Sequence, residues 1–281
     1  MTLHVERFGE GPRPVLLLHG FMGSSAAWFH LKPLLAPSVT ALAVDLPGHG
    51  RSPVLPTQGR EGFEQTLELL DALLERTFGG PVDVVGYSQG ARVALALAAQ
   101  RPERVRRLVL ESGSPGLHAR KLRSLRRAED EARAQTILLD GVTTFVRGWE
   151  QHPVLAGLTR LPDPLRSELR TRREAQSAEG LAWALRSLGV GVQPDLWPAL
   201  PHLRAPTLLL TGSDDVKYTE LARKMAAEIP TVWRHAFAGV GHAPHLEVPA
   251  AWAQEVIGFL STPWYDVIDA DPVDAGGASN R

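Results

Sequence analysis

Short runs of apolar and β-branched residues alternate along most of the chain with longer segments in which apolar residues recur every three or four positions. The short runs predict buried strands, and the longer segments predict amphipathic helices. This alternation is typical of an α/β protein with a mostly parallel sheet and helices on both faces. The predicted strands span residues 14–20, 39–46, 81–88, 105–112, 205–212 and 231–239, and the predicted helices span 61–78, 89–101, 217–228 and 247–260.

The alternation stops between residues 115 and 200, where helical patterns follow one another without a strand. We therefore expect a helical cap, residues 115–200, inserted into an α/β core formed by residues 1–114 and 201–262. Between 118 and 186 there are 13 Lys and Arg residues against 9 Asp and Glu. Most of these charges should lie on solvated helix faces, and a few should face inward. Residues 263–281 contain four aspartates and no periodicity, which predicts a disordered tail.

Composition narrows the class of partner. The 281 residues include 30 Lys and Arg and 31 Asp and Glu, so a net charge of -1 gives no general attraction to nucleic acid or to an anionic membrane. A small-molecule partner is expected instead. The absence of cysteine excludes disulfides, thiolate nucleophiles and cysteine-based metal sites. No signal-peptide pattern and no apolar run of about 20 residues is present, so we expect a cytoplasmic protein without membrane insertion.

The segment Gly86-Tyr87-Ser88-Gln89-Gly90 fits the pattern G-x-S-x-G between a predicted strand and a predicted helix. Glycines at both ends allow a tight turn that projects the serine hydroxyl from the sheet, at the N-terminus of a helix. A serine hydroxyl needs an imidazole to accept its proton and a carboxylate to orient that imidazole. Ser88 is therefore the candidate nucleophile or base.

Candidate partners for this serine follow later strands. Asp214 and Asp215 end the strand "LLLTG", and the segment "VGHAPHLEVP" offers His242 and His245. The position of His242 directly after Gly241 favours it over His245. The alternative for His242 is a loop histidine that caps the helix starting near residue 247.

Two backbone amides are candidate donors to an oxyanion. The amide of Gln89 opens the helix after Ser88, and the pair His19-Gly20 after the first buried strand positions the amide of Phe21. His19 itself is expected to be structural. Residues 14–262 together resemble the α/β-hydrolase fold family, in which the acid follows the strand-ending glycine by three residues. That resemblance selects Asp215 over Asp214.

Arg92 is an unusual residue in its surroundings, because its neighbours in "GARVALALAA" are small and apolar. Residues four apart share one face of a helix and lean toward its N-terminus, so Arg92 leans back toward Ser88. A guanidinium beside the serine indicates an acidic substrate. The alternative is an arginine that reaches the surface between the helix and the cap.

With this arginine, the chain more specifically resembles 2-succinyl-6-hydroxy-2,4-cyclohexadiene-1-carboxylate synthases, lyases of menaquinone biosynthesis. The matching segments are "VGYSQGARVA", "ESGSPGL", "WEQHPVLAGL", "LRTRR", "LGVGVQPDLWPAL" and "GSDDVKY". The resemblance implies a tricarboxylate substrate held by Arg92, Arg126 and Arg173, with Trp149 in the active site. Arg123 and Arg127 remain alternatives to Arg126.

The resemblance also implies a reaction. Ser88, assisted by His242, would remove a proton next to the succinyl ketone, and pyruvate would leave the ring without an acyl-enzyme. No metal or organic cofactor is implied, and no histidine pair has the spacing of a zinc motif. A serine hydrolase acting on a small carboxylate-bearing substrate remains an alternative, because the same three side chains serve both reactions. A non-catalytic receptor for a small acid is a second alternative.

Overall fold

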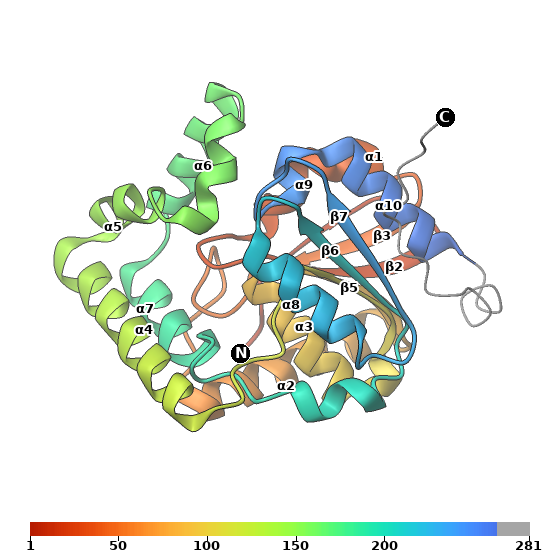
Figure 1. Cartoon of the computed structure of the whole chain (residues 1–281), viewed down its shortest axis with the longest axis horizontal. Helices are drawn as coiled ribbons and strands as arrows, with labels where there is room; N and C mark the ends of the chain where they lie inside the picture. Colours follow the sequence, from red (N-terminus) through yellow and green to blue (C-terminus); the bar gives the residue numbers. More distant parts are fainter. Residues whose placement is uncertain (263–281) are drawn as a thin grey trace.

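A computed structural model describes residues 1–262 of the chain, and the tail predicted for residues 263–281 lies outside them. A seven-stranded sheet with the order β1-β3-β2-β4-β5-β6-β7 crosses the centre of the molecule (Figure 1). All neighbouring strands are parallel except the pair β1 and β3. The α/β fold class predicted from the sequence is therefore confirmed. The strands are β1 (Val5–Phe8), β2 (Arg13–Leu18), β3 (Val39–Val44), β4 (Val82–Tyr87), β5 (Val105–Glu111), β6 (Thr207–Gly212) and β7 (Val232–Phe237).

The edge strand β1 is the one strand of residues 1–262 that the hydrophobic pattern did not predict. Its four residues, "VERF", include two charges, so the run is too short and too polar to be recognised as a buried strand. Val5 pairs with Val44 of β3 in antiparallel register. An edge strand has a neighbouring strand on one side only, so its other side can face solvent, and this permits the polar composition.

Helices cover both faces of the sheet. The helices α2 (Gly59–Phe78), α3 (Gln89–Gln100) and α8 (Val216–Ala226) pack on one face, and η1 (Ser25–Leu31), α1 (Lys32–Leu35) and α10 (Pro249–Ser261) pack on the other. Within the second group, Trp28 of η1 and Trp252 of α10 are fully buried. The helix predicted over 247–260 begins later, at Pro249, because proline lacks an N–H and suits the first helical turn.

Residues 120–188, which lie between β5 and β6 in the chain, form a separate group of helices beside the sheet, at the left of Figure 1. Helices α4 and α7 pack against each other, and α7 also contacts α2 of the core. Met22 of the core is buried with Ile137 and Leu181 of this group. We call the group the cap, and it consists of α4 (Arg120–Asp140), α5 (Val142–Trp149), η3 (Pro153–Arg160), α6 (Asp163–Glu174) and α7 (Ala178–Leu188).

Three short helical turns complete the described chain: η2 (Pro102–Arg104), η4 (Trp197–His202) and α9 (Pro244–Glu247). Within residues 1–262, no helix combines the length and the apolar character that crossing a membrane would require.

Candidate active site

Ser88 occupies a strained turn between β4 and α3. Its backbone has φ 50° and ψ -104°, a region that non-glycine residues rarely adopt. The flanking glycines are required by close packing, because a Cβ on Gly86 would lie 2.5 Å from the carbonyl oxygen of Gly90, and one on Gly90 would lie 2.1 Å from that of Leu18. The G-x-S-x-G pattern thus reflects a steric need on both sides of the serine.

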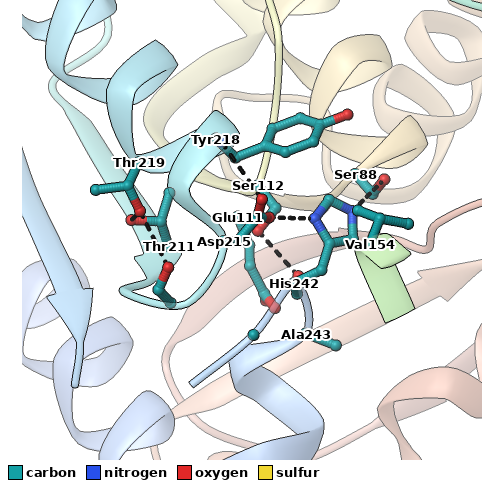
Figure 2. Close-up of polar contacts among 12 residues, drawn as sticks. Ser88, Glu111, Ser112, Val154, Thr211, Asp215, Tyr218, Thr219, His242 and Ala243 are labelled. Atoms are coloured by element: carbon teal, nitrogen blue, oxygen red, sulfur yellow. Dashed lines mark hydrogen bonds and ion pairs between the residues drawn. The ribbon is translucent and has the colours of Figure 1, made fainter. Parts of the chain in front are cut away.

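Ser88, His242 and Asp215 form one hydrogen-bonded chain (Figure 2). His242 Nε2 lies 3.1 Å from Ser88 Oγ, and His242 Nδ1 lies 2.5 Å from Asp215 Oδ2. The three residues follow the carboxyl ends of β4, β6 and β7, which meet at one edge of the sheet. The second Asp215 oxygen, Oδ1, accepts from the backbone N–H of Tyr218 at 3.4 Å. This geometry suits transfer of the serine proton to the imidazole.

The competing candidates have other partners. Asp214 Oδ2 lies 3.2 Å from Arg160 Nη1 in the cap. His245 is buried, and its Nδ1 lies 2.7 Å from Oε1 of Glu111, which is fully buried at the end of β5. The backbone oxygen of Glu111 accepts from the N–H of Ser88 at 2.8 Å. Glu111 and His245 therefore stabilise the backbone beneath Ser88, and His242 is the histidine that contacts the serine hydroxyl.

A cavity of about 560 Å³ opens above Ser88, between the sheet edge and the cap. Phe21 and Gln89, whose backbone amides are the candidate donors to an oxyanion, both line this cavity. Gln89 is the first residue of α3, so its N–H has no intrahelical acceptor. Trp149 also lines the cavity, and its ring lies edge-on to that of Phe21 at 5.7 Å. These residues surround the space next to the serine hydroxyl.

His19 has a structural position, as expected. Its Nδ1 lies 2.7 Å from the carbonyl oxygen of Gly20, and its Nε2 accepts from the N–H of Leu46 at 3.0 Å. Burial lowers the pKa of His19, which keeps the ring neutral and able to fill both roles. The bond from Leu46 joins the loop after β3 to the loop after β2, and the contact with Gly20 fixes the ring within its own loop.

Arg92 lines the same cavity as Ser88 and is 7% exposed. Its Nη1 donates to the carbonyl oxygen of Leu188 at 2.6 Å and to Gln193 Oε1 at 3.2 Å. Burial lowers its pKa to about 10, so the guanidinium remains charged near neutral pH. Its Nε and Nη2 have no hydrogen-bond partner among residues 1–262, and no carboxylate there lies within ion-pair distance. Arg92 is thus a buried cation without an ion-pair contact among residues 1–262, and the charge of Asp130 stabilises it only from a longer distance.

The cap provides further cations to the cavity. Arg126 and Arg173 both line it, whereas Arg123 and Arg127 do not. Arg126 Nε donates to Asp130 Oδ1 at 2.9 Å, and Arg173 Nη1 donates to Glu150 Oε1 at 3.2 Å. Each of these guanidinium groups therefore keeps nitrogen atoms without a partner in the described chain.

Sequence reasoning did not single out several other residues that line the cavity. Arg172 lies beside Arg173 in the segment "LRTRR", and its Nη1 donates to the carbonyl oxygen of Ala26 at 2.9 Å. Burial, followed by the charge of Arg133, lowers the pKa of His152. The excess of basic residues in the cap was the available signal, but a count of charges does not say which ones face inward. Further polar lining residues that the sequence did not indicate include Glu129, Asp130, Arg133, Lys217 and Tyr218.

Within residues 1–262, no group of three or more His, Asp or Glu side chains is placed to hold a metal ion.

Known proteins resemble this chain over most of its length. A family model described as the alpha/beta hydrolase fold matches residues 13–249. A putative 2-succinyl-6-hydroxy-2,4-cyclohexadiene-1-carboxylate synthase of Bacillus subtilis is 33% identical over 258 residues, which cover 90% of this chain and 93% of the relative. The synthase of the same name from Salmonella typhimurium is 35% identical, covering 89% and 95%. Among solved structures, MenH from S. aureus has a TM-score of 0.87 at 32% identity, covering 92% and 97%.

Proposed function

The chain belongs to the α/β-hydrolase fold family and, within it, to the 2-succinyl-6-hydroxy-2,4-cyclohexadiene-1-carboxylate synthases, and we propose that it catalyses the reaction of these lyases. In this reaction, pyruvate is eliminated from 2-succinyl-5-enolpyruvyl-6-hydroxy-3-cyclohexene-1-carboxylate. The substrate is a small tricarboxylate of menaquinone biosynthesis, and we place the reaction in the cytoplasm.

One observation carries the proposal: the guanidinium of Arg92, which has no ion-pair contact among residues 1–262, lines the same cavity as the hydrogen-bonded Ser88 and His242. A buried cation without an anion is costly, and a substrate carboxylate removes that cost on binding. Arg126 and Arg173 face the cavity from the cap, so each of the three carboxylates has an arginine to meet it. A site for neutral esters needs none of these charges.

The hydrogen-bonded chain gives each residue a role in proton removal. His242 Nε2 takes the proton of Ser88, and the Ser88 oxygen then removes the proton next to the succinyl ketone. Asp215 holds the Nδ1–H of His242, which orients the ring and stabilises its charged form. The C–H bond breaks, the electrons move through the ring, and the C–O bond to the enolpyruvyl group breaks.

The amides of Phe21 and Gln89 stabilise the negative charge that develops on the ketone oxygen, which is typically worth about 3–4 kcal/mol per donor. The enolpyruvyl group leaves as the enolate of pyruvate and takes the proton from Nε2 of His242, while the proton from the substrate restores the hydroxyl of Ser88. The serine acts as a base in this sequence, so no bond forms between the enzyme and the substrate.

The test is release of pyruvate from the enolpyruvyl cyclohexene substrate, followed by a coupled lactate dehydrogenase assay. We expect saturable release by the wild-type chain and none by Ser88→Ala. Efficient cleavage of neutral nitrophenyl esters without any pyruvate release would instead support a serine hydrolase.

A further inference from the structure

The Glu247 carboxylate holds the backbone on both sides of the base His242. Both Glu247 oxygens accept from the N–H of Gly241 at 3.0 Å, and Oε1 also lies 3.4 Å from the N–H of Ala243. The Glu247 side chain is only 5% exposed, so this carboxylate is removed from water. Charged acceptors make strong bonds to amides in such surroundings. The backbone N–H groups of the residues before and after His242 are therefore held by one side chain.

Arg160, at the end of η3 in the cap, contacts both loops that carry the acid and the base. Its Nη2 donates to Glu247 Oε2 at 2.8 Å, and its Nη1 lies 3.2 Å from Asp214 Oδ2. Asp214 directly precedes Asp215, and Glu247 holds the loop of His242. One planar guanidinium thus joins the cap to the two loops whose relative position sets the contact between Asp215 and His242.

Close packing surrounds this ionic contact. A Cβ on Gly157 of η3 would lie 2.6 Å from Glu247 Oε1, and one on Gly241 would lie 3.0 Å from the Cα of Gly157. Only glycines allow the two backbones to approach this closely. An apolar cluster beside them joins η3 to the segment after His242, and it consists of Leu155, Leu158, Leu161, Ala243 and Leu246.

We infer that Arg160 and Glu247 are positioning residues that keep the imidazole of His242 within hydrogen-bond distance of Asp215 and Ser88. Through them, this geometry depends on how η3 packs against the loops of the core. Arg160 and Glu247 do not line the cavity above Ser88, so they act through the histidine loop and not through the substrate. Because small displacements of a catalytic group cost large factors in rate, loosening this loop should slow proton transfer more than it weakens binding. The inference rests on the proposed function only where pyruvate release is the readout.

The first experiment measures the reactivity of Ser88 without any natural substrate. A fluorophosphonate reagent reacts with a serine that an imidazole activates: the serine oxygen bonds to phosphorus, fluoride leaves, and the imidazole takes the proton. We expect Arg160→Gln and Glu247→Gln each to lower the labelling rate about tenfold. Arg160→Lys should recover part of the loss, because an ammonium can meet Glu247 but cannot bridge it to Asp214 as a planar fork does.

Arg166→Gln is the matched control, because Arg166 pairs with Asp163 inside the cap and touches neither loop. It should label at the wild-type rate. Arg160 is half exposed, so its replacement should leave the melting temperature within a few degrees of the wild type even where Glu247→Gln unfolds earlier. The Arg160 variants therefore keep the test valid if Glu247→Gln is unstable.

The second experiment measures kcat and KM for pyruvate release. A fall in kcat of about tenfold with KM changed less than about twofold supports positioning. Unchanged labelling by folded Arg160→Gln and Glu247→Gln chains overturns the inference, and so does a rise in KM alone. Absence of pyruvate release from the wild type would refute the proposed lyase reaction, whereas the labelling rates would still decide the role of Arg160 and Glu247.

Discussion

Oδ2 of Asp215 lies 2.5 Å from Nδ1 of His242, while the adjacent Asp214 turns to Arg160 of the cap. Asp215→Asn should therefore lower kcat for pyruvate release by about 10³-fold to 10⁴-fold, because an amide favours the wrong tautomer of the imidazole. Asp214→Asn should lower kcat by less than about tenfold, because it weakens one contact of Arg160 and leaves the hydrogen bonds of His242 to Asp215 and Ser88 in place. Steady-state kinetics of both variants check this, and the opposite ranking would move the acid to Asp214.

The sequence did not decide which of Arg123, Arg126 and Arg127 in α4 faces the substrate, and in the structure only Arg126 lines the cavity. Arg126 lines the cavity, whereas Arg127 donates to Ser124 on the same helix. Arg126→Gln should lower kcat/KM for the tricarboxylate by about 30-fold, the loss of a charge-assisted contact of about 2 kcal/mol. Arg127→Gln, the matched control, should stay within about twofold of the wild type. Equal losses in the two variants would indicate a general charge effect of the cap.

The buried histidines predict a loss of stability in mild acid. Burial lowers the pKa of His19, and burial together with the charge of His19 lowers the pKa of His49 well below 6.5. Both rings are neutral in the folded state but take up protons in the unfolded chain below about pH 6.5, so the unfolded state binds more protons. The free energy of unfolding should therefore be highest above that pH. It should decrease as the pH is lowered further, by up to about 1.4 kcal/mol per pH unit for each histidine.

Urea unfolding at about pH 7 and about pH 5.5 measures this loss for the wild type and for His49→Gln. The variant lacks one of the histidines whose pKa is lowered by burial, so it should lose less stability between the two conditions than the wild type does. A wild-type free energy of unfolding that rises toward the lower pH would contradict the assignment of neutral histidines.

The sheet and the residues around Ser88 could be predicted because their local patterns coincide with their structural needs. The strand predicted over 81–88 is observed as Val82–Tyr87, and Gly86 and Gly90 are required by contacts within the turn itself. Tight turns after buried strands have a restricted set of residues, and this makes them visible in a sequence.

The cap and the histidine loop were less predictable for a physical reason. Helix α4 buries only Asp130, Ala134 and Ile137, so its apolar pattern does not fix which arginines face inward. Packing against α7 determines that direction, and Asp130 then holds Arg126. The role of Glu247 likewise depends on how the loop after β7 folds back over it, which is a tertiary contact without a local signature.

Arg92 provides the sharpest test of substrate charge. Its Nη1 is fixed by Leu188 and Gln193, while Nε and Nη2 remain without partners in residues 1–262. If these atoms bind a substrate carboxylate, Arg92→Ala should lower kcat/KM for pyruvate release by roughly 100-fold, equivalent to about 3 kcal/mol. Arg92→Lys should restore only part of this, because an ammonium does not reproduce a planar two-pronged contact.

Neutral esters give the contrast for the same variants. A nitrophenyl ester has no carboxylate to place, so any slow hydrolysis by the wild type should be unchanged or faster in Arg92→Ala. The melting temperature separates lost binding from lost packing, since Arg92 also joins α3 to the end of α7 through Leu188 and to the following segment through Gln193. A folded Arg92→Ala chain that releases pyruvate at the wild-type rate would show that the carboxylates are held elsewhere, and the remaining candidates would be the cap arginines Arg126 and Arg173.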